Sequence, residues 1–148
     1  MIAINDLQFK YPRKSLLFRG LSMSVEPGHI IGLLGKNGEG KTSLMKLIAG
    51  QMFPTKGEMN VLGEEPARRK VSFLGDVYYL AENNPTLKGC SVGNYFAAVA
   101  PFYPNFSQSE ADSLMREFEL DYKMRMDKMS QGQQKKAAIA LALSLGTH

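Results

Sequence analysis

The sequence predicts an α/β fold, and three observations support it. Residues 1–34 show extended patterns, a glycine-rich loop at residues 35–42 leads into an amphipathic helix, and the chain becomes mostly helical after residue 85. Apolar alternation and short apolar runs indicate strands, whereas apolar residues recurring every three or four positions indicate helices. We therefore expect an α/β part at residues 1–84 and a helical part at residues 85–148.

Size and composition indicate one folded domain. The chain has 148 residues, 44% hydrophobic and 22% charged, close to the average of soluble globular proteins. The net charge of +4 comes without a Lys/Arg run longer than "RRK", so we expect no direct binding of nucleic acid. The single cysteine, Cys90, excludes an internal disulfide and fits a reducing compartment.

No segment suggests a membrane anchor or a signal peptide. Asp6 interrupts the N-terminal apolar stretch that a signal peptide would need. No apolar run approaches the ~20 residues that span a bilayer. We therefore expect a cytoplasmic protein.

The first half predicts strands around one helix. "IAINDLQFKY" alternates, and "LSMSVEPGHIIGLLG" is typical of a strand, a Pro-Gly turn and a second strand, in which "IIGLL" is buried on both faces of a sheet. After the loop, Leu44, Leu47 and Ile48 share one helical face, and Gly50 is expected at the helix C-terminus. "GEMNVLGEE" and "VSFLGDVYYL" predict two further strands, and "EPARRK" between them predicts a loop or a short turn of helix.

The second half predicts three helices. One begins at Ser91 and ends before Pro101, because the residue before a proline avoids helical geometry. The next has Ser107 and Glu110 in capping-box spacing. The last begins around Ser130.

"GKNGEGKT", residues 35–42, matches G-x-x-x-x-G-K-[ST] between a predicted strand and a helix. Its glycines let backbone N–H groups surround phosphates, and the helix N-terminus favours the same anion. In such a loop Lys41 contacts the β- and γ-phosphates and the Thr42 hydroxyl ligates magnesium. The alternative is a glycine-rich turn that binds nothing. The predicted nucleotide-binding residues here are Gly35, Lys36, Asn37, Gly38, Glu39, Gly40, Lys41, Thr42 and Ser43.

Two other nucleotide classes do not fit. Ser43 occupies the place where a dinucleotide fingerprint needs Gly or Ala. The chain has no Asn-Lys-x-Asp motif for guanine. ATP is therefore the expected nucleotide.

"MSQGQQKK", from Met129, places Ser130 and Gly132 at a helix entrance. Together with the phosphate loop, it resembles the signature motif LSGGQ of the ATP-binding cassette (ABC) ATPases, with Met129 for Leu and Gln131 for the first Gly. "GKNGEGKT" then matches the Walker A loop, and "LIAGQMFPTKGEMNVLGEEP" resembles the stretch that follows it. The resemblance covers essentially the whole chain and implies a P-loop NTPase fold of ABC type, with an incomplete core sheet and a helical subdomain.

The resemblance also implies roles for residues outside the loop. Tyr11 would stack on adenine, although an aromatic residue at a strand end is often part of a core. Ser130, Gly132 and Gln133 would contact ATP held by another subunit, a role compatible with Ser130 being an ordinary N-cap. Glu82 stands where many members have a Gln that reaches magnesium, so Thr42 and Glu82 are the candidate metal ligands.

Members of this family continue past the signature helix into an apolar strand that ends in Asp-Glu. No such strand follows "LALSLGTH", so the Walker B aspartate and the catalytic glutamate are missing from the sequence. We expect an N-terminal part of a longer protein, with a natural short form as the alternative. Because phosphoryl transfer needs metal and an oriented nucleophile together, we expect this chain alone to bind ATP weakly and hydrolyse almost none.

The implied function is the ATP-binding subunit of an ABC transporter. It would bind Mg-ATP, form a homo- or heterodimer, and act at the inner face of the membrane on a separate membrane-spanning permease, with export favoured over import. The helical insert, including Phe102, Tyr103 and Phe106, would face the permease, but we favour core packing for these aromatic residues. The alternatives are a soluble ABC protein acting on the ribosome or DNA, and an inert or regulatory nucleotide-binding module.

Overall fold

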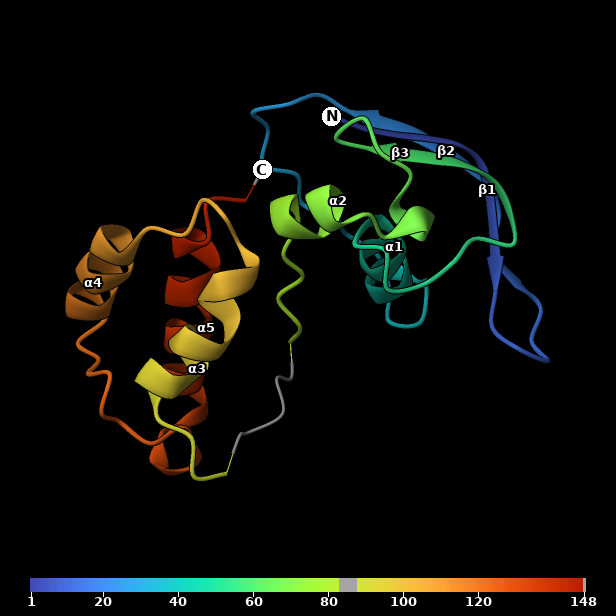
Figure 1. Ribbon diagram of the computed structural model, residues 1–148. Helices are drawn as coiled ribbons and strands as arrows, with labels where there is room; N and C mark the ends of the chain where they lie inside the picture. Colours follow the sequence, from blue (N-terminus) through green and yellow to red (C-terminus); the bar gives the residue numbers. More distant parts are fainter. Residues whose placement is uncertain (83–87, 148) are drawn as a thin grey trace. The chain divides into compact units, whose positions relative to one another are not determined.

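The computed structural model describes residues 1–82 and 88–147 (Figure 1). The chain divides into two compact units, Met1–Leu74 and Gly75–His148. The boundary expected after residue 84 falls outside the described residues. The first unit contains the sheet and the phosphate loop and the second is helical, which confirms the α/β class.

The first unit is built on a three-stranded antiparallel sheet in the order β2-β1-β3. Its strands are β1 (Ile2–Lys10), β2 (Leu16–Val25) and β3 (Lys56–Val61). The alternation in β1 confirms its prediction, because Ile4, Leu7 and Phe9 are buried.

A bulge interrupts β1 at Asp6, which has a positive φ of 47°. The register with both neighbouring strands shifts there. Gly57 on β3 lies against this bulge with a φ of 87°, and a Cβ at Gly57 would collide with the Asp6 carbonyl oxygen. Glycine at this position therefore allows the two strands to approach closely.

Helix α1 (Lys41–Ile48) follows the phosphate loop, as predicted. Leu44 and Leu47 are buried. Gly50, with a φ of 66°, ends the helix, and its N–H donates to the Leu47 carbonyl at 3.0 Å. The Arg69 guanidinium donates to the Gly50 carbonyl and fixes the segment after β3 against this end of α1.

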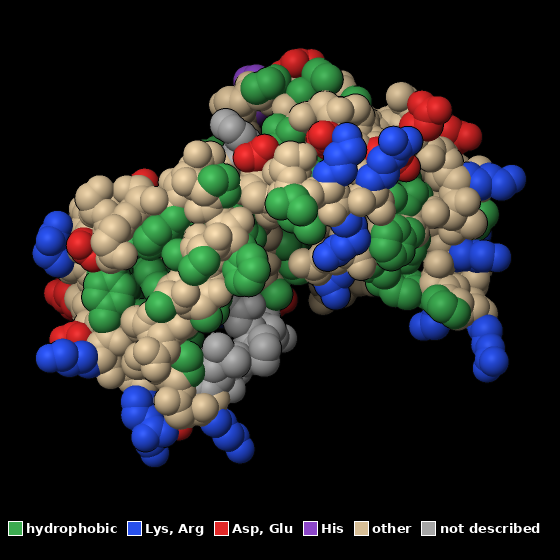
Figure 2. All heavy atoms as spheres, in the orientation of Figure 1, with side chains coloured by type: hydrophobic (Ala, Val, Ile, Leu, Met, Phe, Trp, Pro, Cys, Tyr) green, Lys and Arg blue, Asp and Glu red, His purple; other side chains and the backbone are tan. Residues whose placement is uncertain are grey.

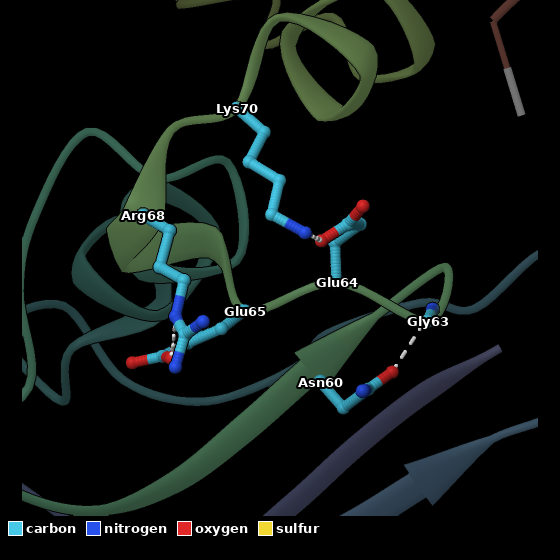
Figure 3. A network of polar contacts seen from close by, with 6 residues as sticks. All are labelled: Asn60, Gly63, Glu64, Glu65, Arg68 and Lys70. Carbon is cyan, nitrogen blue, oxygen red and sulfur yellow. Dashed lines mark hydrogen bonds and ion pairs between the residues drawn. The ribbon is translucent and has the colours of Figure 1, made fainter.

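Two ion pairs close the turn after β3 (Figure 3). Lys70 Nζ lies 2.6 Å from a Glu64 oxygen, and Arg68 Nε lies 2.7 Å from a Glu65 oxygen. Between them, Pro66–Arg68 forms one 3-10 turn, which confirms the predicted short turn of helix. Because three of the four side chains are at least half exposed and Glu64 is partly exposed, each pair contributes about 0–1 kcal/mol.

Residues 30–34 form no strand, so the prediction of a strand buried on both faces is wrong for this structure. Leu34 is 93% exposed and Ile31 is 58% exposed. A buried parallel strand needs hydrogen-bonded neighbours on both sides. No strand within residues 1–82 and 88–147 pairs with this run.

The predicted strand at residues 71–80 is also wrong. Residues Val71–Asp76 form helix α2, and the following residues have no regular structure. Periodicity cannot separate a short apolar run in a strand from one in a helix. Phe73, buried beside Gly50, faces the core of the first unit, while Val71 is exposed.

The second unit contains α3 (Val92–Val99), α4 (Gln108–Glu117) and α5 (Gln131–Ser144). Short 3-10 turns, η2 (Ala100–Phe102) and η3 (Met126–Lys128), lie between them. The three helices lie side by side (Figure 1). Their shared core is Val92, Phe96, Ala111, Met115, Met126, Met129, Ala137, Ala140, Leu141 and Leu145.

Helices α3, α4 and α5 each begin after a serine at the N-cap position, as the sequence indicated. The Ser91 hydroxyl accepts from the Asn94 N–H at 3.1 Å, and the Ser107 hydroxyl accepts from the Glu110 N–H at 3.3 Å. Ser130 caps α5 in the same way. Each cap satisfies a backbone donor that the helix itself cannot.

The aromatic residues of the insert divide into two sets. Tyr103 and Phe106 pack against the helical core, as the favoured alternative expected. Phe102 is 76% exposed. Apolar side chains lie at several places on the face that Figure 2 shows. Tyr103 also packs edge-on against Tyr78, with ring centres 5.7 Å apart, and burial raises the pKa of both phenols.

Candidate functional site

The phosphate loop connects residues 30–34 to α1. Gly38 and Gly40 have φ angles of 88° and 97°, in the left-handed region that glycine adopts without strain. A Cβ at Gly40 would lie 2.8 Å from the Phe18 ring, so β2 packs closely against the loop there. A Cβ at Gly38 would meet no atom within 4 Å, so this part of the loop faces open space.

The N-terminus of α1 is free of side-chain caps. Gly40 occupies the N-cap position, and the first turn carries no acidic residue. Helices α3, α4 and α5, in contrast, each begin with a serine that accepts a backbone hydrogen bond. The uncapped N–H groups of α1 and the positive end of its dipole can therefore serve an external anion.

Lys41 folds back over the loop. Its Nζ donates to the carbonyl oxygens of Gly35 and Lys36, each at 2.7 Å. The Glu39 carboxylate accepts from the Lys36 N–H at 2.8 Å. All these contacts are at the surface, so the lysine and the glutamate can exchange these partners for others.

The donors of this loop fit a phosphate chain. Glycines leave room for close approach of the backbone, the helix entrance offers N–H groups, and Lys41 adds a positive charge. Magnesium has fewer protein ligands: in the described part of the chain no three His, Cys, Asp or Glu side chains gather. Thr42 is exposed in the first turn of α1, and phosphate oxygens would have to complete the coordination.

Glu82, the second candidate metal ligand, is exposed and belongs to the second unit. Its role as a metal ligand therefore stays a prediction.

Tyr11 lies beside the first turn of α1. Its hydroxyl forms a 2.8 Å hydrogen bond with the hydroxyl of Ser43, which is buried. The ring packs edge-on against Phe9, and the residue as a whole is 38% exposed. Tyr11 is thus not a buried core residue.

The predicted trans-acting residues lie together at the start of α5. Ser130 Oγ accepts from the Gln133 N–H at 3.2 Å, and Gln133 Oε1 accepts from the Ser130 N–H at 3.0 Å, which forms a complete capping box. The first turn carries no acidic residue. Because the Ser130 hydroxyl acts as an acceptor here, its own hydrogen remains available for a further acceptor.

Gly132 has no structural requirement for glycine. Its backbone is helical, and an added Cβ would meet only Ser130 Oγ, at 3.9 Å, an ordinary contact. A glycine within a helix costs about 0.5–1 kcal/mol relative to alanine. The missing side chain therefore leaves surface space at the helix entrance that the unit itself does not use.

Gln134 is a positioning residue that the sequence reasoning missed. Its Nε2 donates to the carbonyl oxygens of Met126 and Met129, at 2.9 and 3.1 Å. It thereby ties α5 to the turn that leads into Ser130. The one feature of the sequence that could have indicated this role is that Gln134 directly follows Gln133 of the signature-like segment.

A glycine-rich loop entering an uncapped helix, with its lysine over the loop, defines a P-loop nucleotide-binding fold. More specifically, the chain belongs to the ABC transporter family, whose domain matches residues 18–147. The energy-coupling factor transporter ATP-binding protein EcfA1 of Fusobacterium nucleatum is 30% identical over 156 residues. The phosphonates import ATP-binding protein PhnC of Alcaligenes faecalis is 27% identical over 160 residues. These matches cover 99% and 97% of this chain but only 58% of each relative.

Solved structures agree with this assignment. An ABC transporter ATP-binding protein from Pyrococcus furiosus is 30% identical, with a TM-score of 0.82 over 99% of this chain and 72% of its own. An ATP-binding cassette solved as a dimer with ADP and Pi shares the fold at a TM-score of 0.77 and 18% identity, covering 99% of this chain and 71% of its own. Together they confirm the P-loop fold of ABC type.

None of the helices described is long and apolar enough to cross a membrane.

Proposed function

We propose that this chain binds ATP through residues 35–43 and is part of the ATP-hydrolysing subunit of an ABC transporter. The observation that carries this proposal is the combination at the loop: an uncapped helix N-terminus, glycines in the left-handed region, and a lysine ammonium folded over the backbone. A triphosphate satisfies all three, because it supplies acceptors for the N–H groups and negative charge for the lysine.

Each loop residue then has a role. The N–H groups from Gly38 to Ser43 surround the phosphates. Lys41 exchanges its two carbonyl partners for oxygens of the β- and γ-phosphates. Lys36 and Asn37 line the loop, and the Thr42 hydroxyl would ligate magnesium. The metal-binding role of Glu82 stays a prediction from the sequence. When bound, magnesium neutralises charge on the phosphates.

Tyr11 would hold the adenine. The residue is partly exposed, and the hydrogen bond with Ser43 fixes its hydroxyl beside the first turn of α1. An aromatic ring in a fixed orientation can stack on a base without polar contacts to that base.

The start of α5 would act on ATP held by a second subunit. Ser130 offers a hydroxyl hydrogen, and Gly132 offers a backbone N–H group at an acid-free helix entrance. The Gln133 N–H donates to Ser130 Oγ in this structure, so it would have to leave that partner before it could contact ATP. A cassette of the same fold has been solved as a dimer with ADP and Pi, which supports the dimer in this proposal. The partner would be a second copy or a related subunit.

The whole protein, which we propose to be longer than this chain, would hydrolyse ATP and drive a separate permease from the cytoplasmic face of the membrane. This chain alone would hydrolyse almost none. The exposed Phe102 is available for contact with such a partner. The expectation of export finds no support: the relatives PhnC and ThiQ are named as phosphonates and thiamine import proteins.

Thermal melting with and without magnesium-ATP tests the binding step. At a ligand concentration about 100-fold above Kd, binding stabilises the folded chain by roughly 2.7 kcal/mol. We expect a higher Tm for the wild type and no change for Lys41→Ala. Identical melting of wild type and variant in magnesium-ATP would mean that the loop does not bind ATP.

A further inference from the structure

The phosphate loop already contains an anion, the carboxylate of Glu39. Its Oε2 accepts from the Lys36 N–H at 2.8 Å. The same oxygen lies 2.5 Å from the position that a Cβ on Gly35 would take. The carboxylate thus lies across the start of the loop, in space that exists because residue 35 has no side chain.

A carboxylate and a phosphate need the same partners. Backbone N–H groups of a glycine-rich loop bind either anion, and charge-assisted hydrogen bonds are stronger than neutral ones. Lys41 meanwhile contacts the carbonyl oxygens of Gly35 and Lys36. Glu39 and Lys41 therefore engage the same short piece of backbone, one through its N–H and the other through its carbonyl groups.

The two side chains do not neutralise each other. The ion pairs in the described part of the chain join residues 64 with 70, 65 with 68 and 125 with 127, and none includes Glu39 or Lys41. When a triphosphate enters, Lys41 gains an opposite charge, whereas Glu39 faces a like charge and loses its backbone partner.

We propose that Glu39 is an internal competitor of the nucleotide: its carboxylate holds the loop closed on itself and must leave the Lys36 N–H before a triphosphate binds. This inference rests on the proposed function, since it assumes that the loop binds ATP. The contact is autoinhibitory, so it lowers nucleotide affinity. If Glu39 instead held the loop in the conformation that binds ATP, removing its carboxylate would weaken ATP binding.

The test is calorimetric titration of magnesium-ATP into the wild type, Glu39→Ala and Glu39→Gln. Glu58→Ala is the matched control, because Glu58 is exposed on β3 in the same unit and its loss changes the net charge equally. We expect Glu39→Ala to lower the Kd about three- to tenfold, the effect of one surface charge-assisted hydrogen bond and one like charge. Glu39→Gln keeps an acceptor but loses the charge, so we expect an intermediate Kd.

Unchanged or weaker binding by Glu39→Ala, with Glu58→Ala like the wild type, would overturn the competitor role. An equal gain in Glu39→Ala and Glu58→Ala would also overturn it, since net charge alone would then account for the effect. Lys41→Ala separates the two proposals. If the wild type and Lys41→Ala bind equally or not at all, the proposed function fails, whatever Glu39 does.

Discussion

Replacing Gly132 with alanine should separate folding from function at the start of α5. The added Cβ would meet only Ser130 Oγ, at 3.9 Å, and the backbone is already helical. A Gly→Ala change at a compatible position stabilises by about 0.4–1 kcal/mol, mainly by restricting the unfolded chain. For a unit of this size that corresponds to a rise in Tm of ~2–8 °C.

The same methyl group should interfere with ATP presented by a second subunit. A phosphate that approaches the N–H group of Gly132 needs the space that glycine leaves open. We expect ATP-dependent dimerisation to weaken by about tenfold or more, the loss of roughly 1.4 kcal/mol. Sedimentation velocity with magnesium-ATP measures the dimerisation, and circular dichroism measures the Tm.

Gly93→Ala is the matched control. Gly93 is also helical and in the same unit, but a Cβ there would lie 3.3 Å from the Tyr122 carbonyl oxygen, so we expect this variant to lose stability. If Gly132→Ala lowers the Tm as Gly93→Ala does, Gly132 is required for the stability of the fold. If Gly132→Ala is more stable but dimerises like the wild type, Gly132 does not approach ATP.

Variants at two further positions, Tyr11 and Asp112, test the adenine contact and the pH dependence of stability. Tyr11→Phe should bind magnesium-ATP nearly as tightly as the wild type. Tyr11→Ala should bind about three- to tenfold more weakly, because stacking contributes roughly 0.5–1.5 kcal/mol. Equal affinities of Tyr11→Ala and the wild type in a calorimetric titration would exclude stacking. Asp112 accepts hydrogen bonds from Gln108 and the Tyr122 hydroxyl, each at 2.8 Å, and these lower its pKa. The stability that it contributes is present above about pH 4 and is lost as the pH falls through the lowered pKa. Asp112→Asn should therefore flatten the acid side of the curve of unfolding free energy against pH, and parallel curves for variant and wild type would argue against this role.

The features that the sequence predicted well depend on local chemistry. The spacing of Gly35, Gly40 and Lys41 determines where a loop turns into a helix, and the structure has α1 at that point. Serine caps are equally local, because a hydroxyl reaches an N–H three residues ahead. Ser107 and Ser130 could therefore be assigned as helix starts from sequence alone.

The strand predictions that failed depend on distant partners. "IIGLL" has the composition of a buried strand, but a strand forms only where a neighbour supplies hydrogen bonds. No neighbour within the described residues does so, and its leucines and isoleucines are exposed. The start of "VSFLGDVYYL" is helical, and Phe73 in it is buried beside the end of α1, a contact that no local pattern reveals.

Side-chain partners within the site were likewise beyond sequence reasoning. The Tyr11–Ser43 hydrogen bond joins residues far apart in the chain. The contact between Glu39 and the Lys36 N–H is close in sequence, but it depends on the loop conformation. The motif identified these residues as a group, and only the structure showed which of them contact each other.

The most direct test of the account is to follow backbone amide resonances by NMR during a titration with magnesium-ATP. If the loop binds the phosphates, the amides of Gly38, Gly40, Lys41 and Thr42 should shift most, because their N–H groups face the incoming anion. Lys41→Ala should abolish these shifts. Shifts that leave these four amides unaffected, or that persist in Lys41→Ala, would contradict the assignment of this loop as the nucleotide site.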